Sequence, residues 1–309
     1  MIISCPICHS PESDISTTVS YVPKEYLIVK CRNCSHYFSK IDLTEAAASD
    51  LYNDEVYKVI DNRDSLYSKI IDYEYSRILN IISKRNPPGS RILDFGSGKG
   101  NFLFLAGKLG FKVMGIETAP ERAGFAREKF NLTISETPYS GGAIDSQPFD
   151  VITLFHVLEH LPNPLELLGE LIKDNLKPDG TLILEVPNLA SLQSSIAGNR
   201  WMHLDIPRHI SHFTDRRLID LAEQINLKVI KKEYFSFHLG ILGMCHSIMS
   251  LFGYRGKIIK DLKGYNMKII LALLLTLPPA FILEVLSAVF NKGGIIRIYC
   301  RQEKRSAYK

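Results

Sequence analysis

The stretch Arg91-Ile-Leu-Asp-Phe-Gly-Ser-Gly-Lys-Gly100 decides the fold. An apolar run stops at a glycine-rich turn, and glycines let the backbone approach a ligand closely. A second apolar run, Val113-Met-Gly-Ile-Glu117, ends in a carboxylate nineteen residues after Gly98. An acid at this place can accept two hydrogen bonds from a ribose. The spacing therefore predicts a strand–helix–strand unit with a nucleotide-sized pocket at the end of its strands.

Two common nucleotide motifs do not fit this turn. A dinucleotide turn reads Gly-x-Gly-x-x-Gly, but here Gly100 comes one place early and Asn101 stands where the third glycine belongs. A Walker loop needs Ser or Thr after Lys99, where the chain has Gly100. What remains is Asp-x-Gly-x-Gly-x-Gly, starting at Asp94. A plain glycine-rich turn or a different nucleotide fold stays open as the alternative.

Composition and charge limit the classes of protein. A chain of 309 residues that is 46% hydrophobic can hold one full α/β domain plus additions. The net charge of +4 is spread along the chain, so we expect no nucleic-acid partner. The start, Met1-Ile-Ile-Ser-Cys5, lacks the basic and apolar regions of a secretory signal. We therefore expect a cytoplasmic protein.

Four of the six cysteines form two Cys-x-x-Cys pairs, Cys5 with Cys8 and Cys31 with Cys34, with twenty-two residues between them. Two such pairs brought together by a hairpin give a closed tetrahedral four-thiolate site. A segment this short cannot build its own apolar core, so the metal would supply its folding free energy. We predict a structural zinc ribbon over residues 1–42, with a redox dithiol or unligated cysteines as the alternatives.

The rest of the chain alternates between helical and strand patterns. Residues 43–86 have apolar side chains at helical spacing and form a predicted helical linker. The alternation within residues 87–302 predicts a doubly wound α/β sheet, and 303–309 is a tail. The expected elements are helices at 119–130, at 163–175 and from Thr214, and strands at 132–135, 149–155, 181–186, 228–235 and, antiparallel at the end, 294–300.

The turn from Asp94 to Gly100 resembles the first motif of class I S-adenosylmethionine-dependent methyltransferases. Further segments follow in the order seen in that superfamily, so the resemblance covers about residues 90–235. They are Phe149-Asp150, His156-Val-Leu-Glu-His160, Leu176-Lys-Pro-Asp-Gly180 and Glu185-Val-Pro-Asn188. The cysteine-bearing segment is similar to that of a bacterial subgroup that includes deoxysugar C-methyltransferases. The resemblance implies a Rossmann-like methyltransferase sheet and S-adenosylmethionine as cofactor.

The resemblance also implies a set of cofactor-binding residues. The backbone of the turn would pack on the methionine and ribose portions, Glu117 would bind the ribose hydroxyls, and Asp94 would face the amino group. Both acids could instead be helix caps or loop anchors. The carboxylate on the adenine side stays open between Glu136 and Asp145. The expected cofactor-binding residues are Asp94, Gly96, Ser97, Gly98, Glu117 and His156.

The acceptor side follows strand 149–155, at the carboxyl edge of the sheet where ligands bind. In the sugar C-methyltransferases a Glu-His pair at this place serves proton transfer, which implies that role for Glu159 and His160. That group has a tyrosine two positions before the glutamate, where this chain has Val157. The same Glu-His pair also appears in quinone O-methyltransferases. In either case, Glu159 and His160 are predicted catalytic residues.

Residues 201–213 hold three histidines, an arginine and the only tryptophan. Long loops at this place cover the acceptor pocket in this fold. We predict His209 as the substrate-facing base or orienting group, and Arg208 as the partner of an anionic group on the acceptor. A metal site of His203, His209 and His212, or a plain lid, are the alternatives.

An apolar insertion, residues 238–291, precedes the last strand. Its parts are apolar (240–253), basic (255–268) and then uncharged (269–283). We expect Pro278-Pro279 to interrupt the last part, which favours helices that dock at a membrane surface through residues 240–290 over a spanning helix. Packing against the domain, or against a second subunit in a homo-oligomer, explains the same apolar faces.

These observations predict a methyltransferase acting on a sugar or saccharide intermediate, either small or lipid-linked. It would be cytoplasmic, or peripheral at the inner face of the membrane. The first alternative is a quinone or lipid-precursor O-methyltransferase at the membrane surface. The second is a non-catalytic S-adenosylmethionine-binding module with a zinc ribbon. An RNA methyltransferase ranks last.

Overall fold

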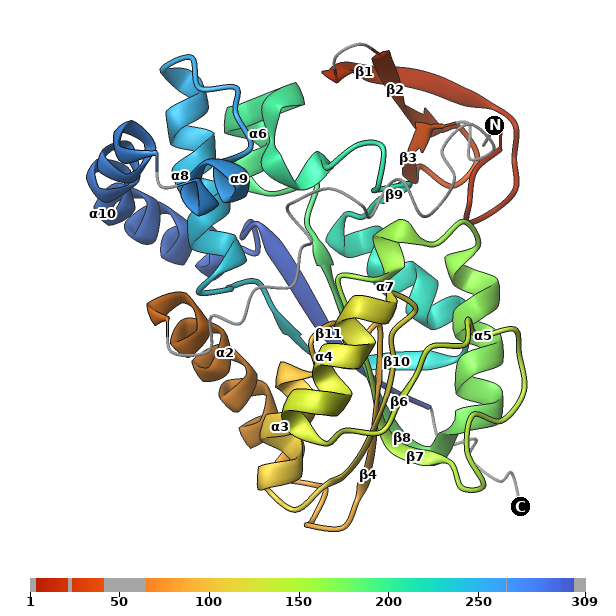
Figure 1. Ribbon diagram of the computed structural model, residues 1–309. Coiled ribbons are helices and arrows are strands. Elements are labelled where there is room, and N and C mark those ends of the chain that lie inside the picture. The colour runs from red at the N-terminus through yellow and green to blue at the C-terminus, as the bar shows by residue number, and fades with distance from the viewer. Residues whose placement is uncertain (1–3, 22–23, 42–64, 265, 303–309) are drawn as a thin grey trace.

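The computed structural model describes residues 4–21, 24–41, 65–264 and 266–302. A seven-stranded sheet lies at the centre, in the order β10-β11-β8-β7-β4-β5-β6 (Figure 1). Its strands are β4 (Arg91–Phe95), β5 (Lys112–Ile116), β6 (Ile134–Ser135), β7 (Phe149–Phe155), β8 (Leu176–Pro187), β10 (Leu227–Glu233) and β11 (Ile295–Gln302). Strands β6, β5, β4, β7 and β8 are parallel, whereas β11 runs antiparallel to both β8 and β10. The predicted doubly wound sheet with an antiparallel last strand is confirmed.

Helices cover both faces of this sheet, because alternate residues of each strand point to opposite sides. Ile92 of β4 lies in a buried cluster with side chains of α2 (Leu66–Ser83), α3 (Asn101–Lys108) and α4 (Pro120–Phe130). The next residue, Leu93, lies in the opposite cluster with α5 (Pro164–Asn175) and α7 (Asp215–Gln224). Both residues are fully buried.

A smaller sheet of four strands carries the amino-terminal segment. Its strands are β1 (Ser13–Tyr21), β2 (Lys24–Cys31), β3 (Tyr37–Lys40) and β9 (Ser211–His212). The last strand belongs to the loop 201–213, and it pairs with β3 through Tyr37 opposite His212 and Phe38 opposite Ser211. The amino-terminal hairpin is therefore joined by backbone hydrogen bonds to the loop that was expected to cover the acceptor.

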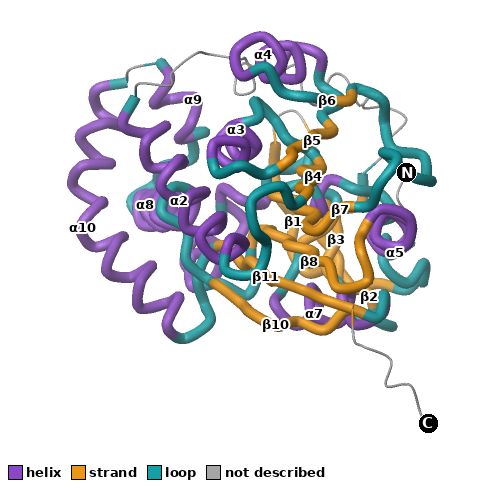
Figure 2. Tube along the Cα trace, turned by 90° about the horizontal axis from the view of Figure 1, so that it is seen from below, coloured by secondary structure: helices purple, strands orange, loops and turns teal. Residues whose placement is uncertain are grey.

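Three helices form the insertion: α8 (Leu239–Leu251), α9 (Ile258–Lys263) and α10 (Met267–Val289). They lie together with the short helix α6 (Leu192–Ala197) on one side of the molecule, and α10 runs along its outer edge (Figure 2). Three-residue 3₁₀ helices occur at Leu158–His160, Gly198–Arg200 and Met202–Leu204. The expected helix over 43–64 lies outside the described residues, while α2 agrees with the rest of that prediction.

The prediction that Pro278-Pro279 interrupts the last apolar run is wrong. Both prolines lie inside α10, which continues for 23 residues. Leu273 before them and Leu283 after them both pack against a buried cluster that is formed by Met244 and Cys245 of α8 and Ala280 of α10. Packing of both halves on one partner helix outweighs the local preference of proline to end a helix.

Candidate active site

A single large cavity of about 1860 Å³ lies at the carboxyl ends of β4, β5 and β7. Its wall includes the glycine-rich turn, the segment after β7, the loop 199–209 and part of the insertion. This is the edge at which ligands bind in open α/β sheets. Ligand pockets usually hold roughly 300–1,000 Å³, so the volume leaves room for a cofactor together with a second molecule.

The glycine-rich turn packs tightly below the cavity. Gly96 has φ +78°, and a Cβ there would lie 2.3 Å from Cγ2 of Val157. The N–H groups of Gly96 and Ser97 donate to the carbonyl oxygen of Ile116, at 2.8 and 2.9 Å, which ties the turn to β5. Gly98 has φ +54° and open space where a Cβ would be. The turn therefore needs glycine at both positions, and it leaves backbone exposed to a ligand.

Glu117 and Asp94 stand at the ends of β5 and β4, and both line the cavity. The two oxygens of Glu117 accept from the N–H groups of Gly98 and Ala119, each at 2.9 Å. This fixes the carboxylate and leaves each oxygen a further lone pair for a ligand hydroxyl. Asp94 accepts from the Thr153 hydroxyl at 2.6 Å, and burial raises its pKa to about 7. A ligand ammonium beside Asp94 would restore its charged form.

His156 follows β7 in the left-handed backbone region, with φ 56°. Its Nε2 lies 3.0 Å from Oε1 of Glu185 and its Nδ1 lies 3.4 Å from Oε1 of Glu159. Burial alone would lower the pKa of His156, but the two carboxylates outweigh it and raise the pKa to about 10. His156 is therefore an imidazolium held between two acids. It lines the cavity, and its expected contact with the cofactor stays a prediction.

The carboxylate of Glu159 is 1% exposed in an environment of three histidines. Burial would raise its pKa, but His156 and the charges of His160 and His209 lower it to about 2. Apart from the ion pair with His156, neither oxygen of Glu159 accepts a well-aligned hydrogen bond within the described residues. A buried carboxylate without such a bond is costly, and a hydroxyl of a bound molecule would supply it.

His160 and His209 lie beside this carboxylate, with ring centroids 4.7 Å apart. Nδ1 of His160 meets the carbonyl oxygen of Arg208 at 3.0 Å, and burial together with His209 lowers the pKa of His160 to about 4. Nδ1 of His209 meets the carbonyl oxygen of His203 at 2.8 Å, and its Nε2 lies 3.9 Å from Glu159. In the neutral form of either ring, an Nδ1 that donates to its carbonyl leaves the lone pair on Nε2.

Comparison with known proteins identifies the family. A family model described as a methyltransferase domain matches residues 67–232, more than half of the chain. The chain belongs to this methyltransferase family. Its Rossmann-like sheet agrees with the fold that the glycine-rich turn predicted.

Curated relatives include the ubiquinone biosynthesis O-methyltransferase of Xanthomonas campestris, 31% identical over 136 residues, which is 41% of this chain and 56% of the relative. The enzyme of the same name from Actinobacillus pleuropneumoniae is 31% identical over 150 residues, 45% of this chain and 63% of the relative. The chain thus spans little more than half the length of the curated relatives it matches. Among solved structures, a chain of the complex between the Haloferax volcanii Trm112 methyltransferase activator and a methyltransferase is similar, with a TM-score of 0.51 and 14% identity over 81% of this chain and 98% of that one.

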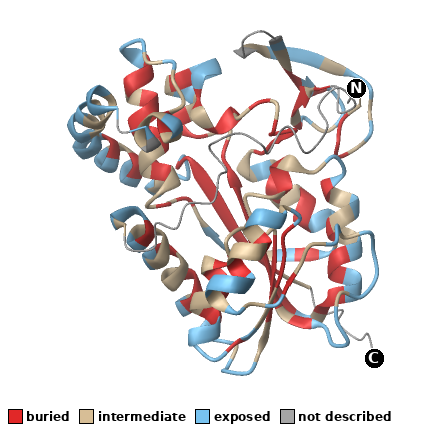
Figure 3. Ribbon diagram, viewed as in Figure 1, coloured by how far each residue is buried: buried red, intermediate tan, exposed pale blue. Residues whose placement is uncertain are grey.

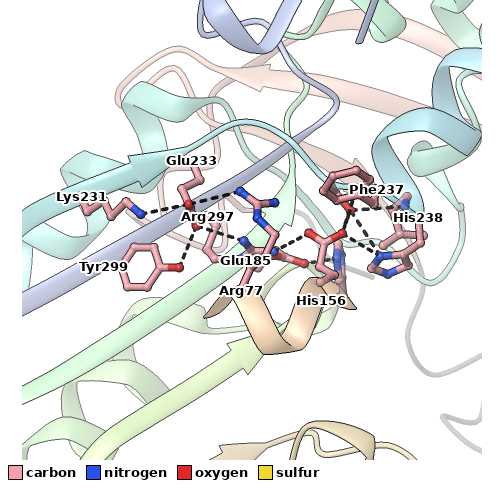
Figure 4. Close-up of polar contacts among 12 residues, drawn as sticks. Arg77, His156, Glu185, Lys231, Glu233, Phe237, His238, Arg297 and Tyr299 are labelled. Carbon is pink, nitrogen blue, oxygen red and sulfur yellow. Dashed lines mark hydrogen bonds and ion pairs between the residues drawn. The ribbon is translucent and has the colours of Figure 1, made fainter. Parts of the chain in front are cut away.

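A buried charged network extends from His156 to the far edge of the sheet (Figure 4). Its centre is Arg297 of β11, whose side chain is 2% exposed and pairs with Glu185. Arg297 also meets Glu74 of α2 at 2.9 Å and Glu233 of β10 at 3.1 Å. Sequence reasoning missed Glu185 and Arg297 as residues that position the site. Only the charged residues inside otherwise apolar strand patterns could have indicated them.

The four cysteines come together as predicted, with every Sγ within 4.8 Å of the others. The Sγ atoms of Cys5 and Cys34 lie 3.5 Å apart, as do those of Cys8 and Cys31. Tetrahedral zinc with Zn–S bonds of about 2.3 Å needs sulfurs about 3.8 Å apart, so the cluster fits that ion. The hydrogen bond from Cys5 lowers the pKa of Cys34 to about 5.

The hairpin of β2 and β3, which contains Cys31 and Cys34, is hydrogen-bonded to the loop 201–213, which contains His209. The N–H of Ser39 on β3 donates to the carbonyl oxygen of Ile210 at 2.9 Å, and its hydroxyl donates to that of His209 at 3.1 Å. Nε2 of His212 lies 2.8 Å from the same hydroxyl. The N–H of Ile210 in turn donates to the carbonyl oxygen of Glu159 at 2.8 Å. The loop 201–213 is thus fixed between the hairpin and the segment that carries Glu159.

Three further residues were considered for the ligands. Arg208 lines the cavity and pairs with Asp205 of its own loop at 2.9 Å, and its role toward an anionic acceptor stays a prediction. Glu136 pairs with Arg127 and Asp145 with Arg91, and neither acid lines the cavity.

The alternative metal site of His203, His209 and His212 does not form. Within residues 4–21, 24–41, 65–264 and 266–302, the groups close enough to hold a metal ion are the four cysteines and the set Glu159, His160 and His209. His203 instead lies 3.3 Å from the carbonyl oxygen of Leu239.

Proposed function

We propose that this protein transfers a methyl group from S-adenosylmethionine to a hydroxyl oxygen of a quinone-precursor type of acceptor. One observation carries the proposal: the buried Glu159 carboxylate, beside His160 and His209 in the cavity, has the His156 imidazolium 3.4 Å from Oε1 but accepts no well-aligned hydrogen bond on either oxygen within the described residues. A phenolic or alcoholic hydroxyl can donate such a bond. The names of the curated relatives support an aromatic acceptor, and Val157 in place of a tyrosine weighs against sugar C-methylation.

The proposed cofactor site is the glycine-rich turn with its two acids. Glu117 holds the ribose hydroxyls, Asp94 meets the amino group of the methionine portion, and the N-terminus of α3 faces its carboxylate. The backbone of Gly96, Ser97 and Gly98 forms the floor. This arrangement would place the methyl group above the end of β4, toward the acceptor side.

The acceptor oxygen attacks the methyl carbon as the C–S bond breaks, and its proton passes to an imidazole. We assign the proton to Nε2 of His209, because its Nδ1 is fixed on the His203 carbonyl and Glu159 lies 3.9 Å from the charge that forms. His160 stays neutral and orients the acceptor. The fixed imidazolium of His156 holds Glu159 ionised. S-adenosylhomocysteine leaves as the product.

The four-cysteine cluster is proposed to hold a structural zinc ion. Two sulfur pairs at 3.5 Å and the burial of Cys5 and Cys31 fit a closed site that leaves no position for a substrate. The ion would act on the reaction only through β3, which holds the His209 loop.

A saccharide acceptor is the second candidate. The gathered cysteine cluster favours it, because that segment resembles the one in sugar methyltransferases. A carbohydrate hydroxyl could also donate a hydrogen bond to Glu159.

A direct assay tests the proposal. Purified protein is given methyl-labelled S-adenosylmethionine with a catechol-type benzoate, with a nucleoside diphosphate sugar, or with no acceptor. We expect label on the phenolic oxygen, and at least 100-fold slower transfer in His209→Gln with unchanged cofactor affinity. Transfer to the sugar alone would overturn the quinone-type acceptor. Cofactor binding without transfer to any acceptor would favour the non-catalytic module.

A further inference from the structure

Helix α10 has an apolar surface that the described protein leaves uncovered. An 18-residue window of this 23-residue helix has a mean hydropathy of 2.4, and by length and composition the helix could cross a membrane, yet only 11% of that window is buried. Figure 3 shows exposed residues along its length. The large apolar side chains that are at least one-third exposed are Met267, Leu271, Leu274, Leu275, Leu277, Phe281, Ile282, Val285, Leu286 and Val289, followed by Phe290.

The polarity of α10 is the reverse of that of an ordinary surface helix. Its buried positions are Ala280, Glu284 and Ser287. Glu284 is fully buried and accepts from the side chain of Gln193 at 2.6 Å and from the N–H of Gly294 at 2.9 Å. Surface helices turn apolar residues inward and polar residues outward. Here Glu284 and Ser287 face the protein, and most of the leucines are exposed.

A rim of positive charge surrounds this apolar face. Between Lys268 and Lys292 the only charged residue is Glu284, which points inward. Both lysines are exposed, one at each end of α10, and Arg255 and Lys260 are exposed on the neighbouring segment. Lysine and arginine beside a deep apolar face match the anionic headgroups and the acyl boundary of a bilayer.

From this combination we propose that α10, with the basic segment 255–268, docks on the surface of an anionic lipid bilayer. The helix lies in the plane of the interface and does not cross it. Both of its ends return into the same folded domain, through Ile258 of α9, which is buried, and through β11. A symmetric contact with a second copy would bring the two basic rims together, which opposes that occupant.

Docking would place the cavity at the membrane. The wall of the cavity includes Arg255, Lys257, Ile258 and Ile259 of the insertion, opposite the glycine-rich turn. An acceptor with an apolar tail could keep its tail in the bilayer while its polar head enters beside these residues. This statement about the acceptor rests on the proposed function, whereas docking itself does not.

Flotation with lipid vesicles tests docking without any acceptor. The full chain is mixed with vesicles of phosphatidylcholine alone or with 30% phosphatidylglycerol, at low and high salt. We expect binding at least tenfold stronger to the anionic vesicles, weakened by salt. The variant Leu275→Glu with Leu286→Glu should lose at least tenfold in binding, while Leu109→Glu, at an exposed leucine that follows α3, should not.

Two outcomes would overturn the proposal. One is equal binding by the wild type and the double variant, or no binding to either vesicle. The other is a dimer in sedimentation velocity that the double variant abolishes, which would assign the face to a second copy. Cofactor affinity, measured in the same samples, controls for folding. Vesicle binding without methyl transfer would leave docking standing and count against the proposed function alone.

Discussion

Replacing Arg297 by methionine tests how the charged network supports the site. The guanidinium is 2% exposed and contacts three carboxylates, those of Glu74, Glu185 and Glu233. Methionine fills the space but leaves these acids without their shared cation. Removing one partner of a buried ion pair costs about 3–5 kcal/mol. If the free energy of unfolding falls by about 3 kcal/mol per M urea, the midpoint of unfolding should shift down by roughly 1–1.7 M urea.

Urea unfolding followed by circular dichroism measures this shift. Arg32→Met is the matched control, because Arg32 pairs with Asp14 where both side chains are about 60% exposed. It should leave the midpoint unchanged, since solvent screens such pairs. A midpoint for Arg297→Met within 0.3 M of the wild type would refute the reasoning that this arginine stabilises the three acids.

Three further predictions concern the turn, the imidazolium and the cysteines. Gly96→Ala should lower the free energy of unfolding by about 1–3 kcal/mol and weaken cofactor binding, because the residue has φ +78° and Val157 occupies the space of a Cβ. A variant as stable as the wild type in urea would contradict this. The pKa of about 10 for His156 lies above the unfolded value of about 6.5, so its contribution to stability is full below pH 6.5 and is lost as the pH rises through 10. The variant His156→Gln should lack that pH dependence in unfolding midpoints between pH 7 and 10. Cys31→Ser should reduce the amount of zinc that the protein binds, as measured by mass spectrometry. It should also slow methyl transfer at least tenfold while the affinity for the cofactor stays unchanged. A variant with the full metal content would exclude the four-thiolate site.

Local motifs predicted much of the cofactor side. The turn from Asp94 to Gly100 and the acid Glu117 follow from spacing within one strand–helix–strand unit, and the structure places both on the cavity wall. The spacing of two residues within each Cys-x-x-Cys pair likewise brings its two sulfurs to one side of a turn. The grouping of the four sulfurs could therefore be predicted from the sequence.

Features that depend on distant pairing could not be predicted. Arg297 is 112 residues from Glu185 and more than 200 from Glu74, and only the folded sheet brings them together. The break that was expected at Pro278-Pro279 is absent for the same reason, because packing against α8 supports the helix on both sides of the prolines. The pairing of β3 with β9, which links the cysteines to the His209 loop, has no local signal either.

The cavity above β4 and β5 is proposed to hold a sulfonium nucleoside through Glu117. Calorimetric titration of S-adenosylhomocysteine into the wild type and into Glu117→Ala measures this contact. We expect one site per chain in the wild type and an affinity at least 100-fold weaker in the variant, with an unchanged circular dichroism spectrum. Equal affinities in the two proteins, or no binding by the wild type, would contradict it.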